Sequence, residues 1–178
     1  MAEHTSIHTE KSTQIMKSHT ACFTGHRRIP AADLPLLSKI LEETIENLIC
    51  QGVIYWGCGG AIGYDQMAGL AVLRLREKYP SVKLIMVLPC HGQESKWSEK
   101  DKEAYRRLLA AADKTVYVSD TYDSGCMARR NFHLIEYSAY CVAYLKHEHS
   151  GTSQTVRLAR EHGLTVINLA DDIKNPIM

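Results

Sequence analysis

Two loops of this chain combine glycine with small polar residues directly after a hydrophobic run. The first spans residues 57–65, Gly-Cys-Gly-Gly-Ala-Ile-Gly-Tyr-Asp, and the second spans residues 149–155, His-Ser-Gly-Thr-Ser-Gln-Thr. Glycine lets a backbone approach a ligand closely, and a helix that follows such a loop offers free N–H groups and a positive dipole end to an anion. The two loops therefore predict a binding site for a nucleotide or another phosphorylated small molecule.

Strand-like and helix-like hydrophobic patterns alternate along the chain, and these elements must position the loops. Strands are expected at residues 20–24, 53–56, 82–88, 115–118, 140–145 and 164–168, and helices at 34–51, 64–78, 98–112, 127–138 and 153–162. Asp33 is expected to cap the first helix. Alternation of this kind implies right-handed βαβ crossovers and an open parallel sheet. We therefore predict an α/β fold, a Rossmann-like three-layer sandwich with a mostly parallel sheet of about six strands.

Composition and charge narrow the class of protein. The formal net charge of +1 argues against a dedicated nucleic-acid surface or acidic-membrane surface. No apolar run approaches the ~20 residues that a membrane helix needs, and the N-terminus lacks the hydrophobic segment of a secretory signal. We expect a soluble cytoplasmic protein without a membrane partner, built from a flexible tail at residues 1–19 and a single domain at residues 20–178.

The unusual residues of the chain gather at the predicted strand ends. Successive strands are followed by loops 25–28, 57–63, 89–93, 119–130 and 147–155, which hold most of the loop glycines, several histidines and the paired arginines. In open α/β sheets, ligands bind in the crevice beyond the carboxyl ends of the strands. The shared position of these loops at one sheet edge supports a single ligand site more strongly than any one motif does.

Several groups at this edge have a functional and a structural interpretation. His26 and Arg27 could bind phosphate or could be solvated loop charges. Asp65 could bond a ribose hydroxyl or could complement the dipole of its own helix. Residues 150–152, Ser-Gly-Thr, offer N–H groups and hydroxyls at a helix N-terminus, which would suit a phosphate.

Arg129 and Arg130 stand at the start of an expected helix, where cations oppose the dipole. Two cations there call for a ligand anion or an acidic partner, so we predict that Arg130 contacts the ligand and that Arg129 pairs with Asp123 or another surface carboxylate. Trp97 could stack on a base or cap the core, and the amide of Gln93 could recognise a base. The tyrosines expected in the core or on a sheet face are Tyr137, Tyr140 and Tyr144.

Absent motifs exclude some chemistry. The dinucleotide fingerprint GxGxxG and the Walker sequence GxxxxGK[ST] are both missing, which disfavours NAD-dependent dehydrogenase chemistry and ATP hydrolysis of the P-loop kind. No CxxC pair is present, and we expect neither a metal nor a cofactor. The cysteines expected as small buried hydrophobes are Cys22, Cys50 and Cys141, and those expected at a pocket floor are Cys58, Cys90 and Cys126.

At these residues the chain resembles the SLOG superfamily, which joins the LOG phosphoribohydrolases to the DNA-processing protein DprA, and it looks closest to the YpsA-like branch. The motifs are Gly-His-Arg at 25–27, Gly-Gly-Ala-x-Gly-x-Asp at 59–65, Pro89 with Gln93 and Trp97, Met-x-x-Arg-Asn at 127–131, and Ser-Gly-Thr-x-x-Thr at 150–155. The resemblance covers roughly residues 20–170 and implies a Rossmann-like fold that binds a nucleotide-like small molecule, often as a homodimer. The ligand-binding residues that we predict are Gly25, His26, Arg27, Gly59, Gly60, Gly63, Asp65, Pro89, Gln93, Trp97, Arg130, Asn131, Ser150, Gly151, Thr152 and Thr155.

The resemblance also separates binding from hydrolysis. In LOG enzymes an arginine and a glutamate carry N-glycosidic cleavage of nucleoside 5′-monophosphates. Arg130 matches that arginine, but Thr155 occupies the glutamate position and Asn131 replaces the following lysine. Threonine cannot stabilise an oxocarbenium-like centre by charge. We therefore expect a nucleotide-binding sensor or regulatory module. The alternative is an N-glycosidase in which Arg130 is catalytic and Asp65 or another carboxylate replaces the glutamate. A third hypothesis is single-stranded DNA binding, as in DprA, which the near-neutral charge disfavours.

Overall fold

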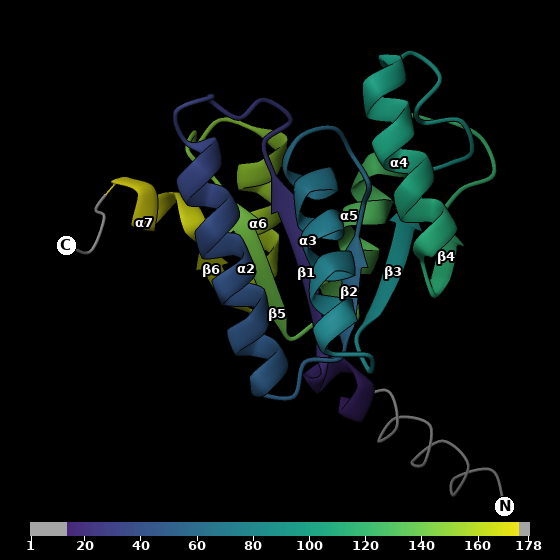
Figure 1. Ribbon diagram of the computed structural model, residues 1–178. Coiled ribbons are helices and arrows are strands. Elements are labelled where there is room, and N and C mark those ends of the chain that lie inside the picture. Colours follow the sequence, from purple (N-terminus) through teal and green to yellow (C-terminus); the bar gives the residue numbers. More distant parts are fainter. Residues whose placement is uncertain (1–13, 175–178) are drawn as a thin grey trace, which may run out of the picture.

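A six-stranded parallel sheet forms the centre of the protein (Figure 1). The computed structural model describes residues 14–174. The strands are β1 (Thr20–Gly25), β2 (Tyr55–Cys58), β3 (Lys83–Leu88), β4 (Lys114–Tyr117), β5 (Tyr140–Tyr144) and β6 (Thr165–Asn168), in the spatial order β4-β3-β2-β1-β5-β6. Each neighbouring pair is parallel. The predicted α/β, Rossmann-like fold is confirmed.

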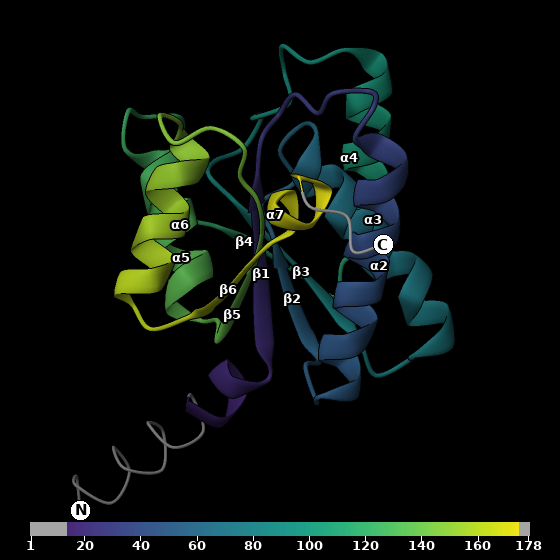
Figure 2. The same ribbon diagram turned by 90° about the vertical axis from the view of Figure 1, so that its left-hand side faces the viewer.

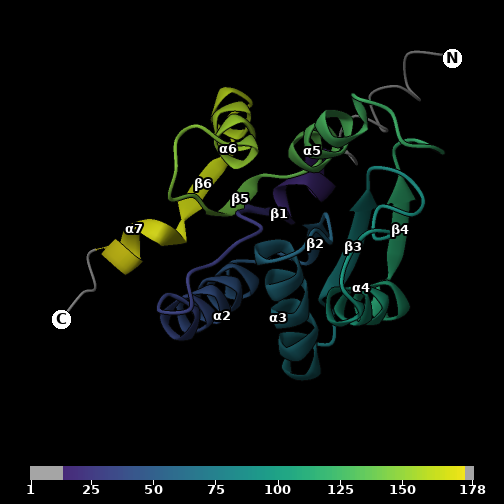
Figure 3. The same cartoon turned by 90° about the horizontal axis from the view of Figure 1, so that it is seen from above.

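Helices cover both faces of the sheet, which Figure 2 views from its edge. They are α2 (Leu34–Cys50), α3 (Tyr64–Lys78), α4 (Glu99–Ala111), α5 (Cys126–Glu136), α6 (Gly151–Glu161) and α7 (Leu169–Lys174). The helices α2, α3 and α4 lie on one face, and α5 and α6 lie on the other (Figure 3). None of the helices within residues 14–174 is long and apolar enough to span a bilayer.

The strand order reverses at β1. Strands β1 to β4 follow one another outward on one side, whereas β5 returns to the other side of β1 and β6 continues outward from it. Right-handed crossovers then send α2 and α6 to opposite faces of the sheet. The carboxyl ends of β1 and β5 therefore flank a topological switch point, where open α/β sheets bind ligands.

A cluster of buried aromatic rings supports the sheet edge beneath this switch point. Phe23 stacks on Trp56 with ring centroids 5.5 Å apart, and Tyr64 stacks on Tyr144 with centroids 5.9 Å apart. A side chain at Gly25 would clash with this cluster, because its Cβ would lie 2.3 Å from Cδ1 of Tyr64. The end of β1 can therefore lie against the start of α3 only with glycine at this position.

The start of α2 differs from the expectation that Asp33 caps the helix. The Asp33 side chain bonds no N–H group of the first helical turn. Its carboxylate instead accepts hydrogen bonds from the Tyr144 hydroxyl and, at 2.7 Å, from Nζ of Lys146. These two bonds, that from Lys146 first, lower the pKa of the Asp33 carboxyl. Because a cation and a phenol are stronger donors than a backbone amide, Asp33 ties α2 to the end of β5.

The cysteines follow the prediction only in part. Cys22 and Cys141 are buried as predicted, and they face each other in the register of β1 and β5. Cys50 is exposed, contrary to the prediction, since it is the last residue of α2. Strand β2 spans Tyr55–Cys58, whereas residues 53–56 were predicted. Because the strand extends beyond residue 56, Cys58 is its last residue and does not lie in the following loop.

The N-terminal segment contains a short helix over residues 14–18. The hydroxyl of Thr20 donates to the carbonyl oxygen of Met16 at 2.7 Å, and Nδ1 of His19 lies 2.6 Å from the carbonyl oxygen of Gly52. The contact of His19 attaches the end of the predicted tail, residues 1–19, to the loop that precedes β2. The remainder of that tail, residues 1–13, lies outside the described residues.

Candidate functional site

A cavity of about 340 Å³ opens at the carboxyl ends of β1 and β5, at the switch point of the sheet. Its walls come from the loop after β1, the start of α3, the start of α5 and the start of α6. The lining residues are Phe23, Thr24, Gly25, His26, Arg27, Ala61, Asp65, Met127, Arg130, Asn131, Ser150, Gly151, Thr152 and Thr155.

Most of the predicted site residues meet in this cavity, although they come from four separate segments. Those that line it are Gly25, His26, Arg27, Asp65, Arg130, Asn131, Ser150, Gly151, Thr152 and Thr155. Those that do not line it are Gly59, Gly60, Gly63, Pro89, Gln93 and Trp97. The lining also includes Phe23, Thr24, Ala61 and Met127, which the sequence reasoning missed even though Met127 shares a helix face with Arg130 and Asn131 at i, i+3 and i+4 spacing.

A buried ion pair forms one wall of the cavity. Nη1 of Arg130 lies 3.2 Å from Oδ2 of Asp65, and the two side chains are 6% and 7% exposed. Burial raises the pKa of the Asp65 carboxyl above its usual value, and the adjacent Arg130 guanidinium opposes that shift. The pair links the first turn of α3 to α5, so Asp65, for which a ribose contact and a helix-dipole role were both considered, holds Arg130, the residue predicted to contact the ligand.

One buried donor atom of Arg130, Nε, is unpaired among residues 14–174. Within the described residues, its buried Nε–H group has no hydrogen-bond acceptor. Leaving such a group unpaired costs about 1–3 kcal/mol, and more when the group is charged. Because Arg130 lines the cavity, an anionic ligand bound there could supply the missing acceptor.

The glycines of the 59–63 loop make room for neighbouring protein groups. A Cβ on Gly59 would lie 1.3 Å from Nη1 of Arg130, and a Cβ on Gly63 would lie 2.2 Å from the carbonyl oxygen of Arg27. Gly63 also has a φ of 85°, which disfavours other residues. These glycines were expected to let the backbone approach a ligand. In the structure they let it approach Arg130 and the loop after β1.

His26 joins the two loops that flank the switch point. Its Nε2 atom accepts hydrogen bonds from the backbone N–H groups of Lys146 at 3.0 Å and His147 at 3.3 Å. Burial, followed by the charges of His147 and Lys146, lowers the pKa of His26. An imidazole that accepts at Nε2 is neutral and carries its proton on Nδ1. His26 therefore offers a ligand a neutral N–H donor. It does not offer the positive charge of a phosphate-binding cation.

The start of α6 forms another wall of the cavity. Ser150 and Ser153 make a reciprocal capping box, with both N–H to hydroxyl distances at 3.1 Å. The N–H groups of Gly151 and Thr152 belong to the first helical turn and have no partner inside the helix. This turn presents backbone donors and a positive dipole end to the cavity.

A hydrogen-bonded pair of uncharged side chains, Asn131 and Thr155, lies at the rim of the cavity. Nδ2 of Asn131 donates to Oγ1 of Thr155 at 2.9 Å, and that hydroxyl donates to the carbonyl oxygen of Gly151 at 3.0 Å. Both capacities of the hydroxyl are thus used by the protein. The pair connects α5 to α6 at the rim and has no group that ionises near neutral pH.

Gln93 and Trp97 support the 59–63 loop from the side of α4. Nε2 of Gln93 donates to the carbonyl oxygen of Gly59 at 3.3 Å and to the hydroxyl of Tyr105 at 3.2 Å. Trp97 packs edge-on against Tyr105 with ring centroids 5.4 Å apart. Trp97 thus has the packing role that was its structural alternative, and neither Gln93 nor Trp97 lines the cavity.

The structure also shows where Arg129 and three of the cysteines lie. Arg129 pairs with Asp123, as predicted. Cys58, Cys90 and Cys126 are buried but do not line the cavity, so they do not form its floor. Among residues 14–174, no group of three or more His, Cys, Asp or Glu side chains is arranged to hold a metal ion.

Comparison with known proteins identifies relatives of this sequence. The model of the YspA SLOG family (YpsA) matches residues 24–162. The uncharacterized SPbeta prophage-derived protein YoqJ of Bacillus subtilis is 31% identical over 141 residues, which cover 72% of this chain and 82% of that protein. A UPF0398 protein of Bacillus velezensis is 35% identical over 80 residues, or 45% of this chain and 44% of that protein. The match thus spans less than half the length of the latter relative.

Solved structures show the same fold at low sequence identity. DprA of Streptococcus pneumoniae superposes with a TM-score of 0.60 at 17% identity, over 86% of this chain and 50% of that chain. DprA of Helicobacter pylori, whose structure was described for its single-stranded DNA binding mode, also gives 0.60, at 18% identity over 87% of this chain and 66% of that chain. At such identities the similarity shows a shared fold alone.

Proposed function

The chain belongs to the YspA SLOG family, and we propose that it binds a nucleotide or a nucleotide-derived small molecule in the cavity between β1 and β5. The observation that carries this proposal is the free Nε–H group of the buried Arg130 in the cavity wall. A buried cation with an unused donor is suited to an anionic group, because charge-assisted bonds to phosphate are short and strong.

Two further features support a phosphorylated ligand. The first turn of α6 offers backbone donors at Gly151 and Thr152 on another wall of the cavity. The cavity volume of about 340 Å³ lies at the lower end of the range for small-molecule sites. A phosphate between Arg130 and α6 would leave the polar rim of the loop after β1 for the rest of the ligand.

The residues of the site favour binding over turnover, so we propose a sensor or regulatory module. Thr155 gives its hydroxyl hydrogen to Gly151 and accepts from Asn131, so it has neither a charge nor a free proton for catalysis. Asp65 is the observation that favours the second candidate function, an N-glycosidase. It lines the cavity, and its burial raises the pKa of a carboxyl toward the range of a general acid.

Thermal-shift titration tests the proposal. Nucleoside mono- and diphosphates, NAD-type compounds, ribose 5-phosphate and inorganic phosphate would be tested separately. A ligand at a hundredfold its Kd should stabilise the protein by about 2.7 kcal/mol. If none of these compounds raises the melting temperature, the proposed function is wrong.

A matched pair of variants locates the binding. Asp65→Asn combined with Arg130→Gln removes both buried charges together and should abolish the ligand-induced shift. Arg129→Gln changes the neighbouring arginine, which pairs with Asp123 at the surface, and should keep the shift. Equal loss in both proteins would contradict a site at Arg130.

The same samples separate binding from the competing activities. Chromatography for free base after incubation with nucleoside monophosphates should find none, whereas base release that Asp65→Asn abolishes would establish the N-glycosidase. A gel shift with single-stranded DNA should show no salt-dependent complex, since the formal net charge is +1 and phosphate contacts require clustered cations.

A further inference from the structure

A hollow distinct from the candidate ligand cavity lies beside α5, over the strands from β2 to β4. Its volume is about 220 Å³, and it shares no lining residue with the cavity between β1 and β5. Helix α5 closes one side, where Leu134 belongs to the same buried cluster as Val87 of β3. The edge strand β4 forms the other side. The hollow is therefore a second concave site on the molecule.

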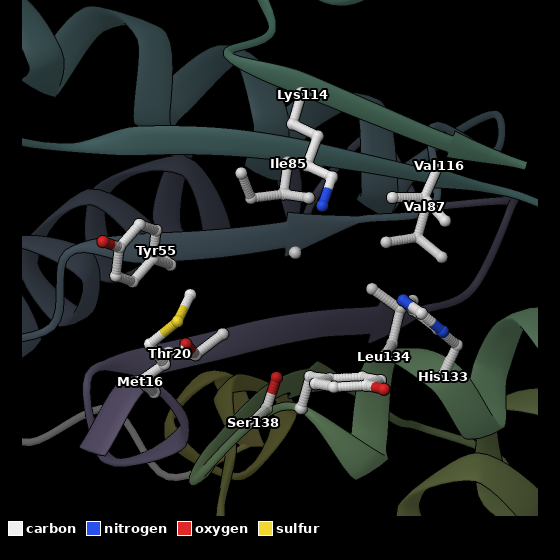
Figure 4. A pocket seen from close by; sticks show the side chains of 12 residues that line it. Met16, Thr20, Tyr55, Ile85, Val87, Lys114, Val116, His133, Leu134 and Ser138 are labelled. Carbon is white, nitrogen blue, oxygen red and sulfur yellow. Dashed lines mark hydrogen bonds between the residues drawn. The ribbon is translucent and has the colours of Figure 1, made fainter. Parts of the chain in front are cut away.

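The walls of this hollow are mainly apolar. Ile85, Val87, Val116 and Leu134 face it from the sheet and from α5 (Figure 4). Gly57 adds no side chain to it, and a Cβ there would lie 2.8 Å from Cδ2 of Leu134. The volume is below the range of about 300–1,000 Å³ that is usual for drug-sized ligands. The hollow therefore suits a short aliphatic chain, because burial of apolar surface is favourable.

A single cation points into these apolar surroundings. Lys114, the first residue of β4, directs its ammonium group into the hollow (Figure 4). It forms no ion pair with another described residue. Within residues 14–174, no carboxylate side chain lines the hollow. The ammonium group thus lacks a counter-ion from the part of the chain that the structure describes.

The other titratable group of basic character in the hollow is neutral. Burial lowers the pKa of His133, while the charge of Glu136 opposes this shift and that of Lys114 adds to it. At neutral pH, Lys114 therefore supplies the positive charge of the described lining. One positive charge matches a monoanion.

The end of α5 indicates how such a ligand would lie. Tyr137 and Ser138, at the C-terminal end of the helix, line the hollow, and Figure 4 shows Ser138 on the side away from Lys114. Tyr137 was expected in the core or on a sheet face, but it is 47% exposed. The negative end of a helix dipole disfavours an anion close to it. The charged group of a ligand is therefore expected at Lys114, with its apolar part toward α5.

We propose that this hollow binds a small aliphatic monocarboxylate. The ammonium group of Lys114 donates to the carboxylate, and the aliphatic chain lies between β3 and α5. A carboxylate fits better than a phosphate dianion, which would need several donors where the hollow offers one cation. This site is independent of the nucleotide site proposed above.

Calorimetric titration with short carboxylates tests the site. Butanoate, pentanoate and hexanoate should bind progressively more tightly, by about fourfold for each added methylene, because the chain leaves water. The compounds 1-hexanol and hexylammonium carry the same chain without the negative charge. We expect 1-hexanol to bind at least about tenfold more weakly than hexanoate, and hexylammonium not to bind.

Backbone amide signals in NMR spectra locate the bound carboxylate. Hexanoate should shift the signals of Ile85, Lys114 and Val116. The signals of Arg130 and Gly151, in the cavity between β1 and β5, should stay unchanged. This measurement is needed because Arg130 is a cation that could also attract a carboxylate.

A matched pair of lysine variants tests the charge. Lys114→Met keeps an apolar stem but removes the ammonium group, and it should weaken hexanoate binding at least about tenfold without changing the binding of 1-hexanol. Lys83→Met changes a lysine of the neighbouring strand that pairs with Asp113 and does not line the hollow. This control should bind hexanoate as the wild type does.

Three outcomes would overturn the proposal. The first is equal affinity for hexanoate and 1-hexanol, which a lysine stem that only covers apolar surface would give. The second is a set of signal changes confined to the cavity between β1 and β5, and the third is the absence of saturable hexanoate binding. Lys114→Met should retain the nucleotide-induced thermal shift, so failure of this proposal is distinguishable from failure of the proposed function.

Discussion

Arg130 and Asp65 form a buried ion pair, 3.2 Å between Nη1 and Oδ2, that joins the start of α3 to α5 along the wall of the candidate site. The space for the guanidinium exists because residue 59 has no side chain. A buried pair contributes little net stability while it is intact, but the loss of one partner leaves an uncompensated charge. The position of Arg130 in the candidate site thus depends on a glycine 71 positions earlier in the chain.

The first prediction concerns Gly59. In Gly59→Ala the added Cβ would lie 1.3 Å from Nη1 of Arg130, so the guanidinium must leave Asp65. We expect a loss of about 3–5 kcal/mol in the free energy of unfolding, measured by urea denaturation, because a buried carboxylate loses its partner. Gly151→Ala is the matched control, since a Cβ there meets no atom within 4 Å. Equal stability of the two variants would refute the link between Gly59 and the ion pair.

The second prediction concerns pH and His26, which accepts hydrogen bonds from the N–H groups of Lys146 and His147. Burial, then the charges of His147 and Lys146, lower the pKa of His26 below 6.5. At pH values between the pKa of His26 in the folded protein and its pKa in the unfolded chain, the unfolded chain therefore carries a proton on His26 that the folded protein does not. The stabilisation by His26 is complete above about pH 6.5 and declines as the pH falls toward the lower pKa of the folded state.

His26→Gln tests this pH dependence, because an amide oxygen can accept the same bonds but does not titrate. Urea midpoints at about pH 5 and about pH 7.5 should differ less in His26→Gln than in the wild type. His162→Gln changes an exposed histidine at the end of α6 and should retain the wild-type difference. The mechanism fails if His26→Gln and the wild type respond identically to pH.

The sequence predicted the fold and most of the cavity lining, because both follow from the order of elements. Alternating strands and helices with right-handed crossovers bring the strand ends to one edge, whatever the side chains are. Gly25, Asp65, Arg130 and Thr155 could therefore be assigned to one site before their partners were known.

The roles of individual residues could not be predicted, because they depend on partners distant in the chain. Gly59 faces Arg130, and Gly25 faces Tyr64, so both glycines make room for side chains that are distant in the chain. Asp33 fits the sequence preference for a helix cap, but Tyr144 and Lys146 compete successfully for its carboxylate. Spacing along one segment carries no information about such contacts.

The third prediction concerns Thr155, whose buried hydroxyl donates to Gly151 and accepts from Asn131. Thr155→Val keeps the shape of the side chain but removes both bonds and leaves the Asn131 amide without its partner. We expect a loss of about 1–3 kcal/mol in the free energy of unfolding and a weaker ligand-induced thermal shift. Thr155→Ser keeps the hydroxyl and should lose less stability and preserve the shift. A Thr155→Val protein that is as stable as Thr155→Ser would show that the two bonds are dispensable.

The fourth prediction concerns the contact that places α5 over β2. In Gly57→Ala the new Cβ would lie 2.8 Å from Cδ2 of Leu134, and the helix or the leucine must shift. Such overpacking typically costs about 1–3 kcal/mol. Leu134→Val shortens the opposing side chain and, made alone, should destabilise the protein by loss of packing. In the double variant the shorter side chain of residue 134 makes room for the new Cβ, so each change offsets the other. A double-mutant cycle of urea denaturation should therefore show a loss in the free energy of unfolding that is smaller than the sum of the two single losses, by about 0.5–3 kcal/mol. Strict additivity would mean that Gly57 and Leu134 do not set the distance between α5 and the sheet.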